Sequence, residues 1–311
     1  MSSGPPQASP ITFVFLDGIG LGPAGAQNPF QPGAMPFLEA LIGGPLVAGR
    51  TVDRPGLLLR PIDASLGIPG LPQSATGQTA LFTGINAPAQ LGFHLSAYPT
   101  PTLQAIIEQH SILKRITALG LNATFANAYT RAYFAAVERG ERKHSASTLC
   151  VLAAGLPFRD FAHLARGQAV FWDITNRMAL ERSPHYPGLK PCHPFDAGVN
   201  LARLAQAHHL VLYESFRSDL IGHAQDWGEA YSFLADLDHF LAGVLSATPG
   251  ATLLITSDHG NLEDLSTKTH TLHQVPLLAI GPGAQAFGQV TDLTGVTPAI
   301  VRHLSQLPST M

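Results

Sequence analysis

The sequence predicts an α/β fold, in which a mostly parallel sheet carries helices on both faces and a small lobe is inserted. Three observations support this prediction. Apolar runs rich in Val, Ile, Leu and Phe recur along the 311-residue chain, amphipathic helical patterns separate them, and one basic segment interrupts the alternation. With 45% hydrophobic and only 13% charged residues, the chain has the composition of a protein that folds around a large core.

Five of the apolar runs have the length and composition of buried strands. They are residues 11–16, 123–129, 210–213, 252–256 and 275–281. Helical segments lie between them, since residues 103–116 and 234–245 repeat apolar side chains at a period close to 3.6. Strands that alternate with helices in this way are typical of a parallel sheet buried on both faces.

A basic segment from Arg131 to Lys190 interrupts this alternation. It holds nine of the 18 Lys and Arg residues against five acids, which gives the segment a net charge of +4. Because the whole chain has a net charge of −3, the rest of the chain carries −7. We assign residues 131–196 to an inserted basic cap lobe, and residues 1–130 and 197–311 to a metal-binding core. A basic lobe over an acidic body favours a small anionic substrate between them; a solvated surface is the alternative interpretation.

Composition also argues against several classes of protein. The isoelectric point is near 6.5 and no basic stripe is interleaved with aromatics, so nucleic-acid binding is not expected. No apolar run approaches the roughly 20 residues of a membrane helix, and the N-terminus lacks the basic start of a secretory signal. Cys150 and Cys192 give no disulfide framework, a single bridge between them being the alternative. We expect a cytoplasmic protein; the sequence does not determine its oligomeric state.

Metal-ligand residues follow three of the predicted strands. In open α/β sheets, ligand sites lie beyond the carboxyl ends of the strands, so these residues are expected to converge. Carboxylate and imidazole groups suit Zn²⁺ and Mn²⁺, and the pattern predicts a site for two divalent ions. The residues are Asp17 after 11–16, Asp219 and His223 after 210–213, and Asp258 and His259 after 252–256, and a histidine also precedes 275–281 in THTLHQVP.

A candidate nucleophile lies in the segment LPQSATGQTALFTG, residues 71–84. Ser74 precedes a stretch of small residues with helical character, where a hydroxyl residue most often serves as a helix cap. A helix N-terminus also stabilises an alkoxide or a phosphoryl group, and a metal ion would activate the hydroxyl further. We therefore predict Ser74 as the nucleophile, with Thr76 as the alternative.

These motifs together resemble the alkaline phosphatase superfamily of metal-dependent phosphoryl-transfer enzymes. The branch of cofactor-independent phosphoglycerate mutase and phosphopentomutase is the most similar. The motifs occur in the family's order and span residues 17–276. They are LDGIG, SATGQ, DLIGH, SDHGN and the His before a Val-Pro strand in THTLHQVP.

The resemblance implies a role for each matching residue. The family's hydroxyl nucleophile carries the phosphoryl group as a covalent intermediate, and a cap lobe is inserted between the nucleophile and the later metal motifs. His270 has the family's five-residue spacing to the Val of Val-Pro, whereas His273 does not and is interpreted as a neighbour of the site or a loop residue. The implied ligands are Asp17, Ser74, Asp258 and His259 for one ion, and Asp219, His223 and His270 for the other.

Departures from the family's pattern limit the implied activity. Gln78 stands where the two mutases usually carry His, and the lobe is much smaller than that of phosphoglycerate mutase. The resemblance implies a phosphatase or phosphomutase that acts on a small phosphate ester through a phosphoserine and two Mn²⁺ or Zn²⁺ ions. Two alternatives are a phosphodiesterase or phosphonate hydrolase on the same site, and a non-catalytic metal-binding homologue.

Several further residues are expected to contact an anionic substrate. Four belong to the basic lobe, for which solvated surface charge is the alternative. Two follow the segment that holds Ser74, for which loop packing is the alternative. They are Arg131, Arg139, Arg142 and Lys143 in the lobe, and Asn86 and His94 after the nucleophile segment.

Overall fold

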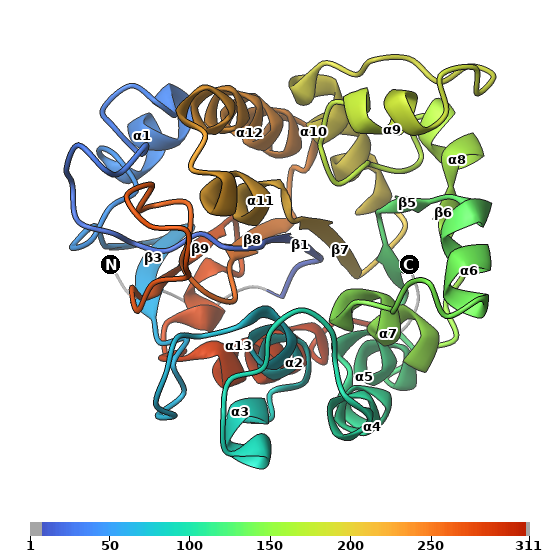
Figure 1. The fold of residues 1–311 in the computed structure, drawn as a ribbon, viewed down its shortest axis with the longest axis horizontal. Helices are drawn as coiled ribbons and strands as arrows, with labels where there is room; N and C mark the ends of the chain where they lie inside the picture. The colour runs from blue at the N-terminus through green and yellow to red at the C-terminus, as the bar shows by residue number, and fades with distance from the viewer. Residues whose placement is uncertain (1–7, 309–311) are drawn as a thin grey trace.

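A seven-stranded sheet crosses the middle of the protein and separates two layers of helices (Figure 1). The computed structural model describes residues 8–308. The strand order is β2-β3-β9-β8-β1-β7-β4. The strands are β1 Ile11–Leu16, β2 Val52–Arg54, β3 Leu57–Ile62, β4 Ala123–Phe125, β7 Leu210–Ser215, β8 Thr252–Thr256 and β9 Val275–Ile280.

The sheet is parallel at its centre and antiparallel towards one edge. β1 runs parallel to β7 and β8, and β4 runs parallel to β7. β9 is antiparallel to β8, β3 to β9, and β2 to β3. The predicted α/β fold is therefore confirmed, whereas the sequence analysis missed the hairpin of β2 and β3, because Arg54, Arg60 and Pro61 interrupt its apolar pattern.

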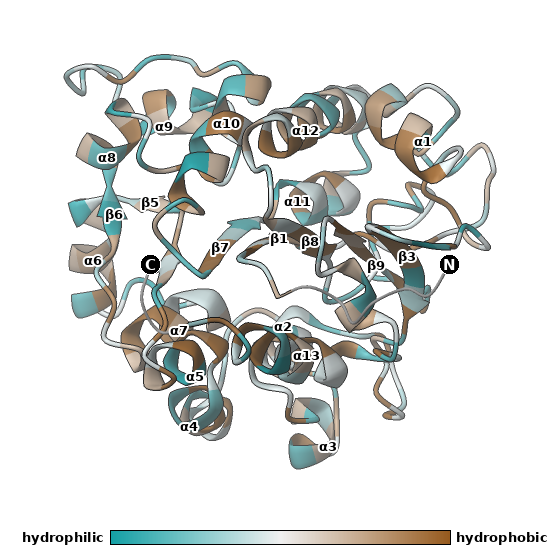
Figure 2. Ribbon diagram, turned by 180° about the vertical axis from the view of Figure 1, so that it is seen from behind, coloured by the Kyte–Doolittle hydropathy of each residue, from teal (hydrophilic) through white to brown (hydrophobic). Residues whose placement is uncertain are grey.

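Two hydrophobic cores lie on opposite faces of the sheet. Successive side chains of a strand point to opposite faces, and β1 divides its residues accordingly. Phe13 and Phe15 belong to one core and Val14 and Leu16 to the other. The central strands are coloured hydrophobic in Figure 2, as expected for strands buried on both sides.

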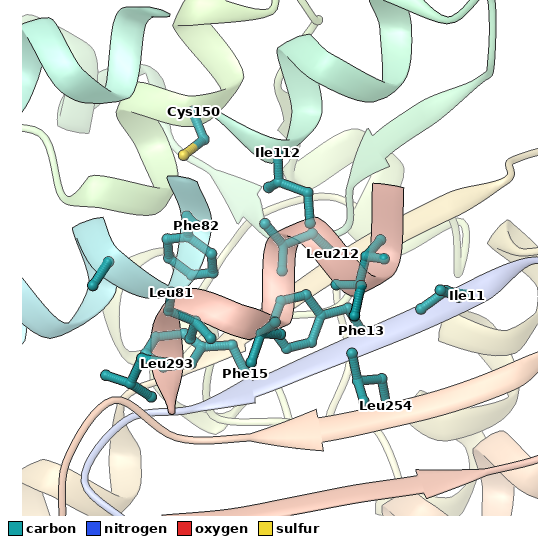
Figure 3. Close-up of a cluster of buried hydrophobic side chains, with 14 of the residues drawn as sticks. Ile11, Phe13, Phe15, Leu81, Phe82, Ile112, Cys150, Leu212, Leu254 and Leu293 are labelled. Atoms are coloured by element: carbon teal, nitrogen blue, oxygen red, sulfur yellow. The ribbon is translucent and has the colours of Figure 1, made fainter. Parts of the chain in front are cut away.

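Helices close both cores. The first core, part of which Figure 3 shows, lies under α2 Ser74–Thr83, α4 Pro101–His110, α5 Ile112–Ala118, α7 Ala146–Ala153 and α13 Val296–Leu304, with α3 Ala87–Leu91 and two 3₁₀ turns, η1 Ala284–Phe287 and η2 Leu293–Gly295, nearby. The second lies under α1 Pro36–Ile42, α10 Pro194–Leu204, α11 Arg217–Ala224 and α12 Trp227–Ala247.

In the described part of the chain, no helix has the length and apolarity needed to span a membrane.

Two of the predicted elements are modified in the structure. The helical pattern at 103–116 is split at Ser111, whose side chain accepts a hydrogen bond from the Lys114 N–H and so caps α5. The apolar run at 123–129 is split into β4 and the short β5 Ala128–Tyr129. Asn127, between these strands, instead bonds the backbone of Glu214 through its side chain. A polar side chain thus ends β4 beside the end of β7.

The segment 131–196 divides between two parts of the molecule. α7 packs against α2, α4 and α5, and its Cys150 and Val151 belong to the first core. The rest forms a side layer with a small core of its own, at the right of Figure 1. This side layer contains β5, α6 Arg131–Glu138, β6 Arg159–Asp160, α8 Phe161–Ala165 and α9 Arg177–Arg182. Both Cys150 and Cys192 are free thiols.

Stability of the first core depends on an aromatic cluster at β1. Phe82 of α2 is fully buried and meets the edge of Phe15 at 5.2 Å and 81°. We expect Phe82→Ala to lower the free energy of unfolding by about 3–5 kcal/mol, because it removes a buried ring and leaves a cavity. Urea denaturation measures the change. Phe93→Ala, at a ring that is 52% exposed, should change it by less than about 0.5 kcal/mol, and equal losses would contradict the assignment.

Candidate metal centre

The ends of three adjacent strands bring the predicted ligands together. Asp17 follows β1, Asp219 and His223 lie on α11 after β7, and Asp258 and His259 follow β8. His270 comes from the loop between β8 and β9, and Ser74 is the first residue of α2. All seven predicted ligand positions therefore meet at one edge of the sheet, as parallel strands require.

One group of ligands surrounds the Nε2 atom of His259. It lies 3.0 Å from Ser74 Oγ, 3.2 Å from Asp17 Oδ1 and 3.5 Å from Asp258 Oδ2. Asp17, Asp258 and His259 are buried, and the ligand atoms of these three residues lie within 4.8 Å of one another. Asp17 Oδ1 and Asp258 Oδ2 have no hydrogen-bond partner among residues 8–308. Two buried carboxylate oxygens left without donors fit a bound cation.

The second group of ligands surrounds Asp219. Its carboxylate oxygens lie 3.3 Å from His223 Nε2 and 3.4 Å from His270 Nε2, and the two histidine nitrogens are 3.2 Å apart. Each histidine places its other nitrogen on a backbone carbonyl: His223 Nδ1 lies 2.7 Å from Lys268 O, and His270 Nδ1 lies 2.8 Å from Pro72 O. A carbonyl at Nδ1 fixes the proton there and leaves Nε2 free to bind a metal.

The two groups are in contact through the rings of His259 and His270. These rings stack with their centroids 3.7 Å apart and 14° between their planes. As a result Asp219, His259 and His270 also have ligand atoms within 4.8 Å of one another. Carboxylates and imidazoles therefore form one continuous site, whose groups can be divided into the ligand sets of two ions.

Without a cation, burial and neighbouring negative charge oppose the ionisation of two carboxyl groups in the cluster. Burial and the nearby Asp258 raise the pKa of Asp17 to about 7. Burial also raises the pKa of Asp258. Burial alone would lower the pKa of His259, but the carboxylates of Asp258 and Asp17 outweigh it and raise that pKa to about 10. The site thus retains protons that a cation would displace.

Asp219 behaves differently from Asp17. Burial would raise its pKa, but contacts with His270 and His259 and a hydrogen bond from Asn261 outweigh burial and lower the pKa to about 2. Asn261 Nδ2 donates to Asp219 Oδ1 at 2.7 Å. The second group therefore keeps its carboxylate ionised and oriented without help from a metal.

Glu263 joins the loops that carry the ligands. It is buried and accepts hydrogen bonds from the backbone N–H groups of Gly20 and Asn261, each at 2.8 Å, through Oε2. Its Oε1 accepts from the Thr271 hydroxyl and lies 3.0 Å from His273 Nδ1. In sequence, Gly20 lies close to Asp17, Asn261 lies close to His259, and Thr271 follows His270 directly. One carboxylate thus joins the loop after β1 to the loop between β8 and β9, and ties together the two parts of the latter that carry His259 and His270.

Close approach of α2 depends on the glycine of the SATGQ motif. A Cβ atom built on Gly77 would lie 2.9 Å from the backbone oxygen of Asp258. Gly18, after Asp17, has φ +73°, and a Cβ there would lie 2.8 Å from Asp219 Oδ1. The spacing Ser-x-x-Gly therefore places Ser74 against the metal cluster because the helix can pass directly over the loop after β8.

The two candidate nucleophiles occupy different environments. The N-cap of α2 is Gln73, so Ser74 does not serve as the cap, and its hydroxyl faces His259. Thr76 is buried; its hydroxyl donates to Gln73 O and accepts from the Leu95 N–H, both at 3.2 Å. The Thr76 hydroxyl is thus occupied in a structural role. Gln78, one turn after Ser74, donates to Asp17 Oδ2 at 2.9 Å and orients that ligand.

A cavity of about 450 Å³ opens above Ser74. Asp17, Gln78 and Asp219 line it together with residues of the side layer, among them Tyr133 and Trp172. Of the predicted substrate contacts, Arg142 and Lys143 line this cavity.

The other predicted substrate contacts lie outside the cavity lining. Arg139 is exposed and pairs with Glu141 at 2.6 Å, and Arg131 is an exposed residue at the start of α6. Asn86 caps α3 by accepting from the Ala89 N–H, and His94 Nε2 lies 3.1 Å from Ile68 O. Arg139, Asn86 and His94 thus have local partners, and a substrate contact of any of these four side chains stays a prediction.

Comparisons with known proteins agree with this geometry. Residues 197–306 match the model of the metalloenzyme superfamily. A stretch of 110 residues is 34% identical to the 2,3-bisphosphoglycerate-independent phosphoglycerate mutase of Idiomarina loihiensis and covers 32% of this chain and 21% of that protein. A stretch of 90 residues is 34% identical to a phosphopentomutase of Methylobacterium radiotolerans and covers 28% and 21%. The matched stretch is thus about a fifth of the length of these curated relatives.

The fold extends the similarity to nearly the whole chain. The PH0037 protein from Pyrococcus horikoshii aligns with a TM-score of 0.56 at 12% identity, over 97% of this chain and 98% of that one. The alkaline phosphatase of the Antarctic bacterium TAB5 aligns with a TM-score of 0.52 at 15% identity, over 97% and 100%. The fold is thus similar to that of an alkaline phosphatase, and residues 197–306 match the metalloenzyme superfamily. Both findings support the resemblance that the motifs predict.

Sequence reasoning missed the residues that support the predicted ligands and those that line the cavity. Glu263 follows SDHGN by two positions, and its place beside the motif was the available signal. Glu214 precedes Asp219 by five positions; it is buried beside the cavity, and burial raises its pKa to about 7. The aromatic wall residues Tyr129, Tyr133, Phe171, Trp172 and Phe216 gave no periodic signal.

Removing the carboxylate that joins the ligand loops should weaken metal binding. We expect Glu263→Ala to lower the affinity for Mn²⁺ or Zn²⁺ by about 10–100-fold, because Gly20 and Asn261 lose their acceptor. Calorimetric titration of the metal-free protein measures it. Glu229→Ala is the matched control, since it removes a surface pair with Arg217. Unchanged affinity in Glu263→Ala would show that the loops are held by other contacts.

Metal binding should release protons in a pH-dependent manner. At pH 6 the metal-free site holds a proton on Asp17, with its pKa near 7, and one on His259, with its pKa near 10. We expect binding to release about two protons at pH 6 and fewer as the pH rises through 7, because Asp17 is then already ionised. Calorimetry in buffers of different ionisation enthalpy counts them. No release at pH 6 would exclude these residues as ligands.

Proposed function

We propose that this protein is a metal-dependent phosphoryl-transfer enzyme, a phosphatase or phosphomutase that acts on a small phosphate ester through Ser74. The observation that carries the proposal is the position of the Ser74 hydroxyl, 3.0 Å from His259 Nε2 at the floor of a cavity and beside two unpartnered buried carboxylate oxygens. The similarity to mutases and phosphatases supports the same class of reaction.

The ligand set fits two divalent cations. Asp17, Ser74, Asp258 and His259 would hold one ion, and Asp219, His223 and His270 the other. Oxygen and imidazole ligands without thiolate suit Mn²⁺ or Zn²⁺. When bound, such a pair supplies Lewis-acid stabilisation of the charge that develops on the oxygens of an in-line displacement.

Ser74 would carry the phosphoryl group between donor and acceptor. As its Oγ attacks, the new Oγ–P bond forms and the P–O bond to the departing alkoxide breaks, while the proton lost by the Ser74 hydroxyl balances the proton that the alkoxide takes up to leave as the alcohol. Attack by water, or by a second hydroxyl, then transfers the phosphoryl group and restores Ser74. Gln78 and Glu263 would keep Asp17 and the ligand loops in place during both steps, through the hydrogen bonds described above.

The cavity supports a small anionic substrate. Arg142, Lys143 and Arg182 line its walls and would attract a phosphate towards Ser74. A volume of about 450 Å³ falls in the range of cavities that enclose small molecules. Side-layer residues cover the site, and such a cover limits the access of water to a phosphoserine.

Replacing the nucleophile tests the proposal. We expect Ser74→Ala to lower the release of phosphate from monoesters, with Mn²⁺ or Zn²⁺ added, by at least about a thousandfold, because no hydroxyl then forms the intermediate. The metal content of the variant must match that of the wild type, so that the loss is assigned to the hydroxyl. Thr76→Val should retain measurable turnover.

Three results would contradict the proposal. Equal turnover in Ser74→Ala would move the attack away from this hydroxyl. Faster cleavage of diesters or phosphonates than of monoesters by the wild type would favour a diesterase or phosphonate hydrolase. Metal binding without turnover of any phosphate ester would indicate a non-catalytic homologue.

A further inference from the structure

The walls of the cavity above Ser74 are aromatic. Three carboxylates line the cavity, and all of them, Asp17, Glu214 and Asp219, come from the ends of core strands or the helix after one. Among the described residues, the side layer contributes no carboxylate to the lining. A polyol phosphate needs polar partners for each hydroxyl that it buries, whereas rings suit a planar apolar group.

The most defined part of the wall is a stacked pair of rings. Trp172 and Phe216 lie with their centroids 4.2 Å apart and 21° between their planes. Trp172 is only 7% exposed, and its indole Nε1 is buried without a hydrogen-bond partner among residues 8–308. Because this donor is closed off from the cavity, the pair offers ring surface to a ligand.

This wall is fixed to the core before any ligand binds. Tyr213 donates its hydroxyl to Phe171 O at 2.9 Å, and Ser215 donates to Trp172 O at 2.7 Å. Both donors belong to β7, the strand that leads to Asp219. The aromatic wall and the metal ligands are thus attached to the same strand, which is the pre-organisation that a specific site requires.

The facing wall presents further rings with satisfied hydroxyls. The Tyr129 hydroxyl lies 2.7 Å from Thr148 Oγ1, and the Tyr133 hydroxyl lies 3.0 Å from His144 Nδ1. These hydroxyls already have partners, so the tyrosines offer the cavity mainly their apolar ring surfaces. The Arg182 guanidinium lies 5.5 Å from the Trp172 ring and forms no ion pair with the acids of residues 8–308. The cavity thus combines aromatic surface with a free cation.

We propose that the cavity binds a phosphate ester whose alcohol carries a planar aromatic ring, of the nucleoside monophosphate class. The ring lies at the Trp172–Phe216 pair, and the phosphate reaches Ser74. This inference rests on the proposed function only for the reaction that follows binding. The binding preference is argued from the aromatic residues of the cavity alone. Stacking on aromatic side chains and cation–π contacts supply the selectivity.

The two tryptophans of the chain allow a direct binding test. Trp172 lines the cavity, whereas Trp227 begins α12 and does not. In the metal-loaded Ser74→Ala/Trp227→Phe protein, all tryptophan fluorescence comes from Trp172 and no ester is consumed. Titration with adenosine 5′-monophosphate and with ribose 5-phosphate compares ligands that share the ribose phosphate and differ in the ring. We expect saturable quenching by adenosine 5′-monophosphate, with a Kd at least about tenfold below that of ribose 5-phosphate.

A matched pair of variants locates the preference. Phe216→Leu keeps an apolar side chain but removes the ring, and it should abolish the tenfold preference while the Kd for ribose 5-phosphate stays unchanged. Tyr231→Leu removes an exposed ring of α12 outside the cavity and should leave the preference intact. Equal Kd values for the two ligands, or a preference that survives Phe216→Leu, would overturn the proposal.

Turnover then separates this inference from the proposed function. Ring-dependent binding without turnover of adenosine 5′-monophosphate or of any other phosphate ester by the wild type would contradict phosphoryl transfer and support the aromatic site. Release at equal kcat/KM from adenosine 5′-monophosphate and ribose 5-phosphate, with equal Kd values, would support phosphoryl transfer and overturn the aromatic site.

Discussion

Buried negative charge at the ends of β1 and β8 is the constraint on which the rest of the site depends. Asp17 Oδ1 and Asp258 Oδ2 both approach His259 Nε2, and neither has a hydrogen-bond donor in the described structure. Carboxylates in this situation are costly unless a cation joins them. The adjacent Asp219 group, in contact through the stacked His259 and His270 rings, extends the same demand to a second ion. Ser74 lies where such charge would activate a hydroxyl.

Rigid attachment to the sheet holds these charges in place. Glu263 ties the loop after β1 to the loop between β8 and β9, and within the latter it ties the part beside His259 to the part that carries His270. The same principle applies to the side layer. Asn127 bonds the backbone of Glu214, while Tyr213 and Ser215 bond the segment of Phe171 and Trp172. β7 therefore leads into α11, which holds Asp219 and His223, and it also anchors the segment of Phe171 and Trp172.

This arrangement separates chemistry from selectivity. The predicted metal ligands come from strand ends of the core, and the side layer contributes rings and cations to the lining of the cavity. Gln78 illustrates the division, because it holds Asp17 from α2. Changes in the side layer can thus alter the substrate without disturbing the ions.

The sequence by itself determined the strands of the sheet centre and predicted the seven ligand positions and the choice of Ser74, because apolar runs and short motifs at strand ends are local signals. It also indicated a basic segment. Only the tertiary structure decided that α7 packs in the core, that Asn86 and His94 bond within loops, and that Glu263 joins the loop after β1 to the loop between β8 and β9. It alone stacked Trp172 on Phe216, which are 44 positions apart, because such contacts depend on chain packing and leave no periodic trace in the sequence.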